Sequence, residues 1–319
     1  MSTATRHEEA AVVGHTPSGP QRLSAAEWVA VFKRTFRQFL ADDCMGLAQQ
    51  VAYSSLLAFF PAVVLLVGLL DLIGAYDQLQ EFLNPVAPQA VTDLIEQLQE
   101  DSSGGASVVA VVVGAFGAVW AASGAMGSVV KAVNRAYDRM ETRPWWKVRL
   151  ISIVLVAAFG LVTAGMLLMI VFGGKLGEAI AAQAHLGGAF EWLWNILRWP
   201  LAFVAVLLLF ALVYYLAPNK EQRDWKWLTP GSLLGSAMWI ALSGLFALYT
   251  AFSDSYSATY GTLAGGIILL LWLNFTAWSL LFGAELNAEL DRQADIRAAG
   301  GPPGGAGQAG EKEALTTAR

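Results

Sequence analysis

Long runs without charged side chains recur along the chain, and each run is apolar almost throughout. A helix needs about 20 apolar residues to cross roughly 30 Å of hydrocarbon, and these runs lack the alternation of barrel strands. The pattern therefore predicts an all-α fold, a polytopic transmembrane bundle of six helices with short amphipathic surface helices. We place the spans near residues 47–70, 106–128, 150–173, 199–217, 229–252 and 263–284.

Two stretches outside these runs have the periodicity of amphipathic helices. In residues 24–40, apolar side chains recur at helical steps among the cations Lys33, Arg34 and Arg37. This helix either lies on the cytoplasmic leaflet, attracted by anionic lipid, or packs under the bundle. Residues 91–98 form a second stripe with acidic neighbours, and we expect a short helix there that caps the outer side.

Lysine and arginine are divided unequally between the two sides of this topology. Of the 20 such residues, 18 lie on the side that holds both termini and 2 on the other. Cytoplasmic segments carry the excess of cations, so we expect both termini in the cytoplasm. Residues 1–22 are predicted to be a disordered leader, residues 23–290 the transmembrane domain, and residues 291–319 a flexible cytoplasmic tail.

Composition narrows the classes of function. Hydrophobic residues make up 56% and charged residues 14% of the chain, whereas soluble domains carry about 25% charged residues. A net charge of −5 argues against a nucleic-acid partner, and the single Cys44 excludes a disulfide scaffold. With three histidines and no hydrolase, metalloprotease or phosphate-binding motif, we expect no catalytic residue, no metal and no cofactor.

Polar residues inside the spans are the candidates for function, because they cost several kcal/mol in lipid unless they find partners. In the first span, Gln50, Ser54 and Pro61 share a helix face, and Pro61 should kink the helix. Asn274 and Glu285 share a face of the last span. These side chains either line a hydrophilic cavity between the two spans or only form interhelical hydrogen bonds. The candidate polar pathway consists of Gln50, Tyr53, Ser54, Pro61, Asn274 and Glu285.

Small residues recur at four-residue spacing and permit helices to approach closely. The pairs are Gly117 with Ala121, Ser123 with Gly127, Gly124 with Ser128, Gly231 with Gly235, and Gly261 with Gly265. They predict tight packing of the second, fifth and sixth spans.

Four sequence runs resemble one family of bacterial membrane proteins. They are QQVAYSSLLAFFP (49–61), WAASGAMGSVVKAVNRAY (120–137), YGTLAGGIILLLW (260–272) and GAELNAEL (283–290). Together they resemble the YihY/BrkB family, whose members have been labelled ribonuclease BN and virulence factor BrkB. The resemblance implies a multi-pass protein of the bacterial inner membrane with an envelope function, and it carries no accepted catalytic residue. Beside Tyr53, Pro61 and Glu285, the matching motif positions include Trp120, Asn134, Tyr137, Tyr260, Gly261 and Asn287.

Two functions fit these residues. The first is an envelope transporter, or a protein that translocates lipids or other amphiphiles, without ion coupling through a buried charge, because no ionisable residue lies in the middle of a predicted span. The alternative is a non-catalytic scaffold that organises envelope proteins or lipids. Membrane lipids are the expected partners, with a homo-oligomer or an envelope protein partner left open. A membrane-embedded ribonuclease finds no support, since nothing here positions a metal or activates water at a phosphodiester, and we expect no enzyme.

Overall fold

The computed structural model describes residues 25–72, 108–171, 183, 187–220, 229–251 and 263–298, and every regular element within them is a helix. The predicted leader (1–22), the outer acidic helix (91–98) and the motif residues Tyr260 and Gly261 lie outside the described residues. The helices are α2 (Ala25–Ala41), α3 (Cys44–Leu72), α6 (Val108–Ala136), α7 (Trp145–Val171), α9 (Gly187–Leu216), α10 (Pro230–Ala251) and α12 (Leu263–Ala298).

Six of these helices, all except α2, are long and apolar enough to cross a membrane. This confirms the predicted all-α bundle with six spans. Two boundaries differ from the prediction. The candidate span in α9 begins at Trp192 and contains Arg198, because the helix starts at Gly187 and continues through Pro200. At the other end, α12 continues past residue 291, where we placed the start of the flexible tail, as far as Ala298.

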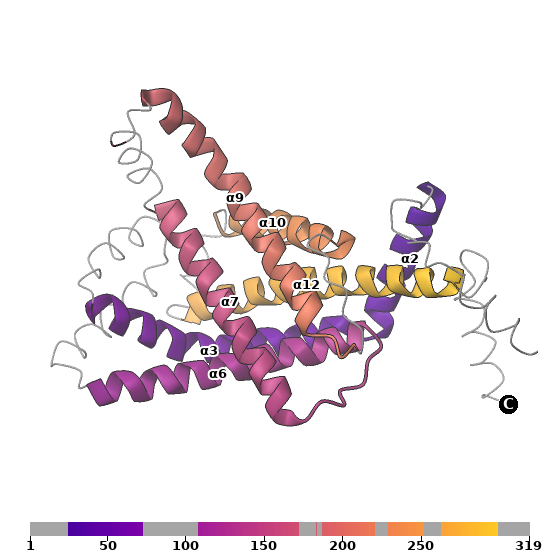
Figure 1. The fold of residues 1–319 in the computed structure, drawn as a ribbon, viewed down its shortest axis with the longest axis horizontal. Coiled ribbons are helices and arrows are strands. Elements are labelled where there is room, and N and C mark those ends of the chain that lie inside the picture. The colour runs from indigo at the N-terminus through magenta and orange to yellow at the C-terminus, as the bar shows by residue number, and fades with distance from the viewer. Residues whose placement is uncertain are drawn as a thin grey trace, which may run out of the picture.

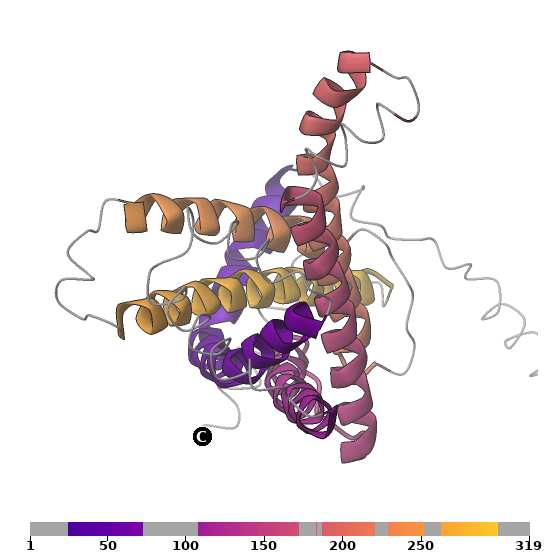
Figure 2. The same cartoon turned by 90° about the vertical axis from the view of Figure 1, so that its left-hand side faces the viewer.

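The helices are arranged in two sets (Figure 1). Helices α3 and α6 lie side by side, with α12 packed against α3 and α10 packed against α12. Helices α7 and α9 cross this set steeply, α7 packing on α6 and α9 packing on α10 (Figure 2). The buried apolar core joins α3, α6, α9 and α12 and includes Cys44, Val133, Phe210 and Leu281.

Helix α2 has apolar side chains on both its buried and its exposed face. One face is buried, with Val31, Thr35 and Phe39 turned inward, and the helix packs on α12 and α3. The other face stays exposed and is also apolar, so the two expected placements of this helix are compatible. The exposed side chains are Val29, Phe32, Phe36 and Leu40.

Aspartates shape the turns at one end of the bundle. Asp43, between α2 and α3, has a positive φ of 52°, and its Oδ1 accepts a hydrogen bond from the backbone N–H of Gly46. Asp138 has a φ of 50° just after α6, where the backbone of Arg139 donates to the carbonyl of Asn134. Short polar side chains tolerate this left-handed conformation, and the second pattern is a Schellman motif. These turns place Cys44 and Tyr137 at the same end of the bundle.

The predicted close approaches of small residues are found on α10. A Cβ atom on Gly231 would overlap the carbonyl oxygen of Gly283, and one on Gly235 would lie 2.9 Å from the hydroxyl of Tyr214. At this crossing the Tyr214 hydroxyl donates to the carbonyl of Leu280 at 2.7 Å. In α6, by contrast, Gly117 faces open space. Helices α10 and α12 therefore touch backbone to backbone, whereas part of α6 is uncovered.

Candidate functional site

Buried polar side chains follow one face of α12 where it meets α2 and α3. Glu285, Glu289 and Gln293 succeed one another at four-residue steps, and all three are buried. The thiol of Cys44 donates to Glu285 Oε1 at 3.3 Å, and Gln293 Nε2 donates to Glu289 Oε1 at 2.9 Å. The guanidinium of Arg34 lies 3.5 Å from Glu289. We name Glu285, Glu289 and Gln293 the α12 polar row.

The two carboxylates of this row have different partners. Glu289 is near two cations, because Arg292 Nη1 also lies 3.7 Å from its Oε2. Glu285 is 1% exposed and, among the described residues, forms no ion pair. A buried carboxylate without a cation is costly unless hydrogen bonds compensate it. Glu285, the carboxylate of the α12 polar row without a cation, therefore lies against α3, where it accepts from Cys44. The sequence patterns did not single out this cysteine as a site residue.

Tyr137 and Asn287 lie at the same end of the bundle, so the motif residues converge there. Asn287 accepts from the backbone N–H of Gly231 at 2.9 Å and donates to Thr229 Oγ1 at 3.0 Å. Lys220 Nζ lies 4.3 Å from the ring centroid of Tyr137. Burial, reinforced by the charge of Asp291, raises the pKa of Tyr137 above its ordinary value, although a hydrogen bond with Asn287 opposes the shift.

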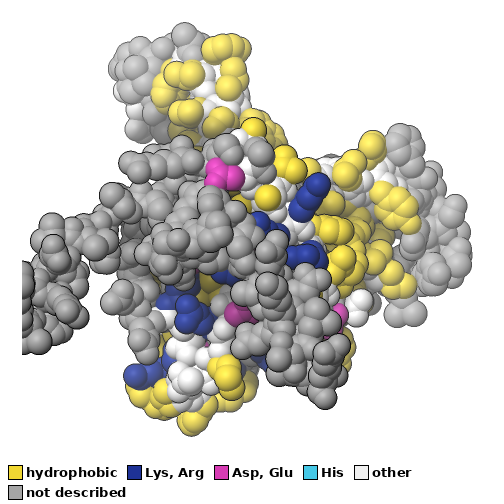
Figure 3. All heavy atoms as spheres, turned by 90° about the vertical axis from the view of Figure 1, so that its right-hand side faces the viewer, with side chains coloured by type: hydrophobic (Ala, Val, Ile, Leu, Met, Phe, Trp, Pro, Cys, Tyr) yellow, Lys and Arg dark blue, Asp and Glu magenta, His cyan; other side chains and the backbone are white. Residues whose placement is uncertain are grey.

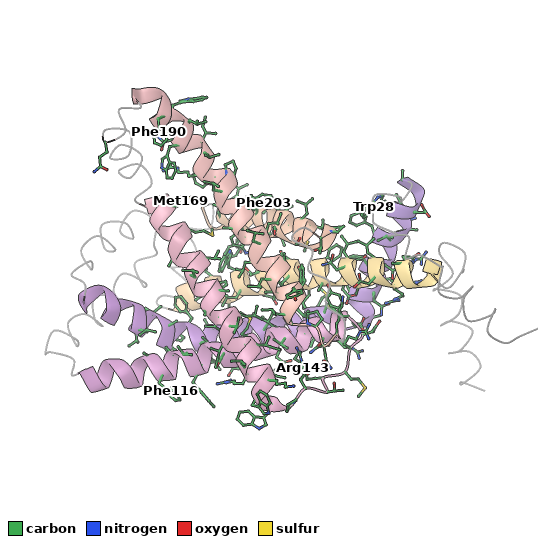
Figure 4. All side chains as sticks on the ribbon, in the orientation of Figure 1. Trp28, Phe116, Arg143, Met169, Phe190 and Phe203 are labelled. Atoms are coloured by element: carbon green, nitrogen blue, oxygen red, sulfur yellow. The ribbon has the colours of Figure 1, made fainter. Side chains whose placement is uncertain are left out.

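Asn134, the remaining described motif residue at this end, organises the connection between α6 and α7. Its Nδ2 donates to Glu141 Oε2 at 2.8 Å, and its Oδ1 accepts from the backbone N–H of Asn219 at 2.7 Å. Arg143 donates to the carbonyls of Leu216 and Ala217 at the end of α9, at 3.3 and 2.8 Å. These carbonyls have no partner within the helix. The connection is thus fastened to α9, and Figure 4 shows Arg143 in it.

Glu141 is the fourth residue of this set of contacts. Its carboxylate accepts from Arg143 Nη2 at 2.6 Å and from Arg143 Nε at 2.7 Å. The hydrogen bonds from the Arg143 guanidinium lower the pKa of Glu141, against a smaller opposing effect of desolvation. We name Asn134, Glu141, Arg143 and Asn219 the α9 clamp. Its role is structural, because its hydrogen bonds hold the connection after α6 to the end of α9.

The predicted polar pathway is spread over several surfaces. Gln50 and Tyr53 are exposed on α3, and Ser54 Oγ lies 3.0 Å from Ser128 Oγ of α6. Pro61 lies inside α3. On α12, Asn274 Oδ1 is buried and has no hydrogen-bond partner within the described part of the chain. Glu285 reaches α3 through Cys44, and the pathway itself stays a prediction.

Helix α6 carries a polar face that is only partly covered. From Trp120 to Arg135, its five residues follow one another at steps of four, four, three and four, which places them on one side of a helix. Trp120, Gly124, Lys131 and Arg135 are exposed, and Ser128 is half-buried. Helix α3 lies on one flank, through the Ser54–Ser128 contact, and α7 packs on the other. We name this face, consisting of Trp120, Gly124, Ser128, Lys131 and Arg135, the α6 stripe.

Arg149 of α7 lies over one end of this stripe. Its guanidinium carbon is 3.9 Å from the ring centroid of Trp120, and its Nη2 donates to the Trp120 carbonyl at 2.7 Å. Its Nε is buried without a hydrogen-bond partner among the described residues. At the other end of the stripe, Arg135 pairs with Asp42 at 3.2 Å. The stripe therefore begins and ends at a guanidinium.

Charged residues lie within several of the candidate spans, towards their ends. Arg198 lies six residues from the start of the α9 span, and its Nε atom is buried without a hydrogen-bond partner in the described structure. Glu285 lies nine residues from the end of the α12 span. Neither residue lies at the middle of its span, so the absence of an ionisable residue there stays a prediction. Figure 3, which views the molecule from the α2 end, shows Lys and Arg gathered beside Asp and Glu.

In the described segments, no three His, Cys, Asp or Glu side chains are placed so that they could hold a metal ion. Several of the polar residues above carry no signal in the sequence that would separate them from structural ones. Cys44, Arg143 and Arg149 are examples, since their roles depend on contacts between distant helices.

Comparisons with known proteins agree on one family. A model of the family described as virulence factor BrkB matches residues 35–305. The putative ribonuclease-like protein YfkH of Bacillus subtilis is 28% identical over 266 residues, covering 83% of this chain and 96% of that protein. The UPF0761 membrane protein IL2447 of Idiomarina loihiensis is 26% identical, covering 84% and 96%.

A UPF0761 membrane protein of Chromohalobacter salexigens is 28% identical over 287 residues, covering 85% of this chain and 66% of that protein. No solved structure matches the chain. The family match begins within α2 and includes the described helices from α3 to α12, so it concerns the whole bundle.

Proposed function

Since the chain belongs to the virulence factor BrkB family of membrane proteins, we propose that it moves a lipid or another amphiphile between the leaflets of the bacterial inner membrane. The proposal includes an orientation with both termini in the cytoplasm, as the distribution of Lys and Arg predicts. It also treats the chain as a non-enzyme, so the ribonuclease-like name of the Bacillus relative is not extended to this protein.

The α6 stripe is the observation that carries the proposal. From Trp120 to Arg135 it covers 15 residue steps, or about 22 Å of helix, against roughly 30 Å of hydrocarbon. An exposed polar face inside a membrane span is costly, because lipid tails offer no hydrogen-bond partners. A polar head group that moves along such a face can keep hydrogen bonds while its acyl chains stay in the lipid.

The α6 stripe also has open space beside its glycines, where a ligand could lie. Gly124 has no side chain, and a Cβ atom there would meet only Arg149 Nη1, at 3.7 Å. Gly117 lies two turns further along the same face, and a Cβ atom added there would have nothing within 4 Å. Uncovered glycines on a polar helix face allow a head group to approach the backbone closely.

Transport in this form needs no coupling ion. The cations of the stripe lie at its surface, whereas the isolated carboxylate Glu285 lies on α12 against α3. Movement along the stripe therefore requires no charge change in the α12 polar row, and the lipid gradient alone sets the direction.

A liposome assay tests the proposal. The purified protein is reconstituted with a trace of fluorescent phospholipid, and a membrane-impermeant reductant reports the fraction of label that changes leaflet. Gly124→Leu should slow translocation at least tenfold, since it places a branched side chain on the stripe. Gly160→Leu is the matched control, because Gly160 of α7 is exposed and also has nothing within 4 Å of an added Cβ.

Equal rates in protein-containing and empty liposomes would overturn the proposal and favour the scaffold alternative. Equal slowing by Gly124→Leu and Gly160→Leu would remove the α6 stripe from the path. Cleavage of RNA by the purified protein, abolished by one defined acidic substitution, would contradict the assignment as a non-enzyme.

A further inference from the structure

We infer that the α6 stripe contains a binding site for the phosphate of an anionic lipid head group, between Arg149 and Lys131. This inference rests on the proposed function, because it assigns a class of head group to the same path. Neither cation has a carboxylate partner within the described residues, whereas Arg135 is paired with Asp42. Two cations without a carboxylate partner on one exposed face favour the binding of an anion.

Arg149 is held in place for such a ligand before the ligand arrives. Stacking on Trp120 and the hydrogen bond to the Trp120 carbonyl fix the guanidinium plane. A guanidinium has five N–H donors, and within the described part of the chain only one hydrogen bond is made by this one. The Nε atom is buried and lacks a hydrogen-bond partner among the described residues, so the donors left for a ligand are those of the terminal nitrogens. A planar fork with free donors matches the oxygens of a phosphate.

The spacing along α6 fits a head group rather than a bare ion. Gly124 lies beside Arg149, and Lys131 follows two turns later, about 10 Å along the helix. Ser128 lies between them and brings a hydroxyl that already contacts Ser54. A phosphate at Arg149 therefore leaves the polar remainder of a glycerol-type head group beside Ser128 and Lys131.

The acyl chains of the ligand have an apolar surface to follow. Phe116 stacks on Trp120, with ring centroids 6.1 Å apart, and is 69% exposed. Figure 4 shows Phe116 on the outward side of α6, away from the bundle. Because this surface belongs to a candidate membrane span, the anion that reaches it is a lipid and not a soluble phosphate.

Equilibrium binding in detergent tests the site without any movement between leaflets. The probes are short-chain phosphatidylglycerol and phosphatidylcholine with identical acyl chains, titrated against the full-length protein by calorimetry. Phosphatidylglycerol should bind about tenfold more tightly, a difference expected of one charge-assisted contact. Arg149→Gln should remove most of this preference, while Arg149→Lys should keep part of it.

Lys147→Gln is the matched control. Lys147 is two residues from Arg149, so it lies about 200° around α7, beside Trp146. Its substitution should leave the preference unchanged. Each variant is used only if it elutes as a single species with a wild-type helical spectrum, and Arg149→Lys covers the case in which Arg149→Gln does not fold.

Three results would overturn the inference. They are equal binding of the two lipids by the wild-type protein, equal losses in Arg149→Gln and Lys147→Gln, and competition by soluble glycerol phosphate as strong as that by phosphatidylglycerol. Selective binding without translocation would instead refute the proposed function and keep the site. Translocation without head-group preference would refute the site and keep the function.

Discussion

The α9 clamp gives the most quantitative prediction, through the substitution Arg143→Met. Methionine has nearly the length of arginine but no donors, so the carbonyls of Leu216 and Ala217 lose their side-chain partner. The side chain of Arg143 is only 10% exposed, so water replaces these contacts poorly. We expect the clamp to weaken while the apolar contacts of α9 remain.

The size of the effect follows from the individual contacts. A hydrogen bond to a charged group contributes about 1.5–3 kcal/mol, and the bond to Ala217, at 2.8 Å, is the shorter of the two carbonyl contacts. The ion pair with Glu141 adds little, because Glu141 is 32% exposed and solvent screens it. Arg143→Met should therefore lower the free energy of unfolding by about 3 kcal/mol. Arg143→Lys should lose less, since one donor can still reach a carbonyl.

Reversible unfolding in mixed detergent micelles, followed by circular dichroism, measures this difference. Arg139→Met is the control, because Arg139 is an exposed cation in the same connection. Substitutions at such surface positions usually change stability by no more than about 0.5 kcal/mol. If Arg143→Met were as mild as Arg139→Met, the clamp would contribute nothing and the reasoning would fail.

Three further predictions concern other parts of the bundle. Gly283→Val should destabilise the protein by more than about 2 kcal/mol in thermal melts, because its side chain meets the opposite backbone, whereas Gly244→Ala, in open space, should not. The lowered pKa of Glu141 adds stability above its unfolded pKa of about 4.3, and this contribution is lost as the pH falls through the lower folded value. Urea titrations should show that loss in the wild type but not in Arg143→Met. Cys44 is fully buried, so a maleimide should label it only after denaturation, as mass spectrometry of the intact protein can measure. Rapid labelling of the folded protein would contradict that burial.

The spans could be predicted from the sequence because hydropathy is a local property. Six apolar runs are sufficient to identify six helices, without any knowledge of their neighbours. Boundaries were less certain, since charge marks where a run ends but not where a helix ends. Arg198 shows the difference: it closes a charge-free run, yet α9 continues well beyond it towards Gly187.

The sites could be predicted only in part. Asn134, Tyr137, Glu285 and Asn287 matched motif positions, and the structure brings them to one end of the bundle. The α6 stripe was not expected as a unit, because its polarity depends on Arg149, which reaches across from another helix. Contacts between residues far apart in sequence leave no periodic pattern on either helix.

The order in which the helices touch has a mechanical consequence. Helix α6 contacts α7, α7 contacts α9, α9 contacts α10, α10 contacts α12, and α12 contacts α6 again. Rigid rods joined in such a closed circuit cannot separate at one junction unless another junction yields. A tilt of α10 against α12 would therefore have to be taken up at other contacts of the circuit, including the one between α6 and α7 beside the α6 stripe.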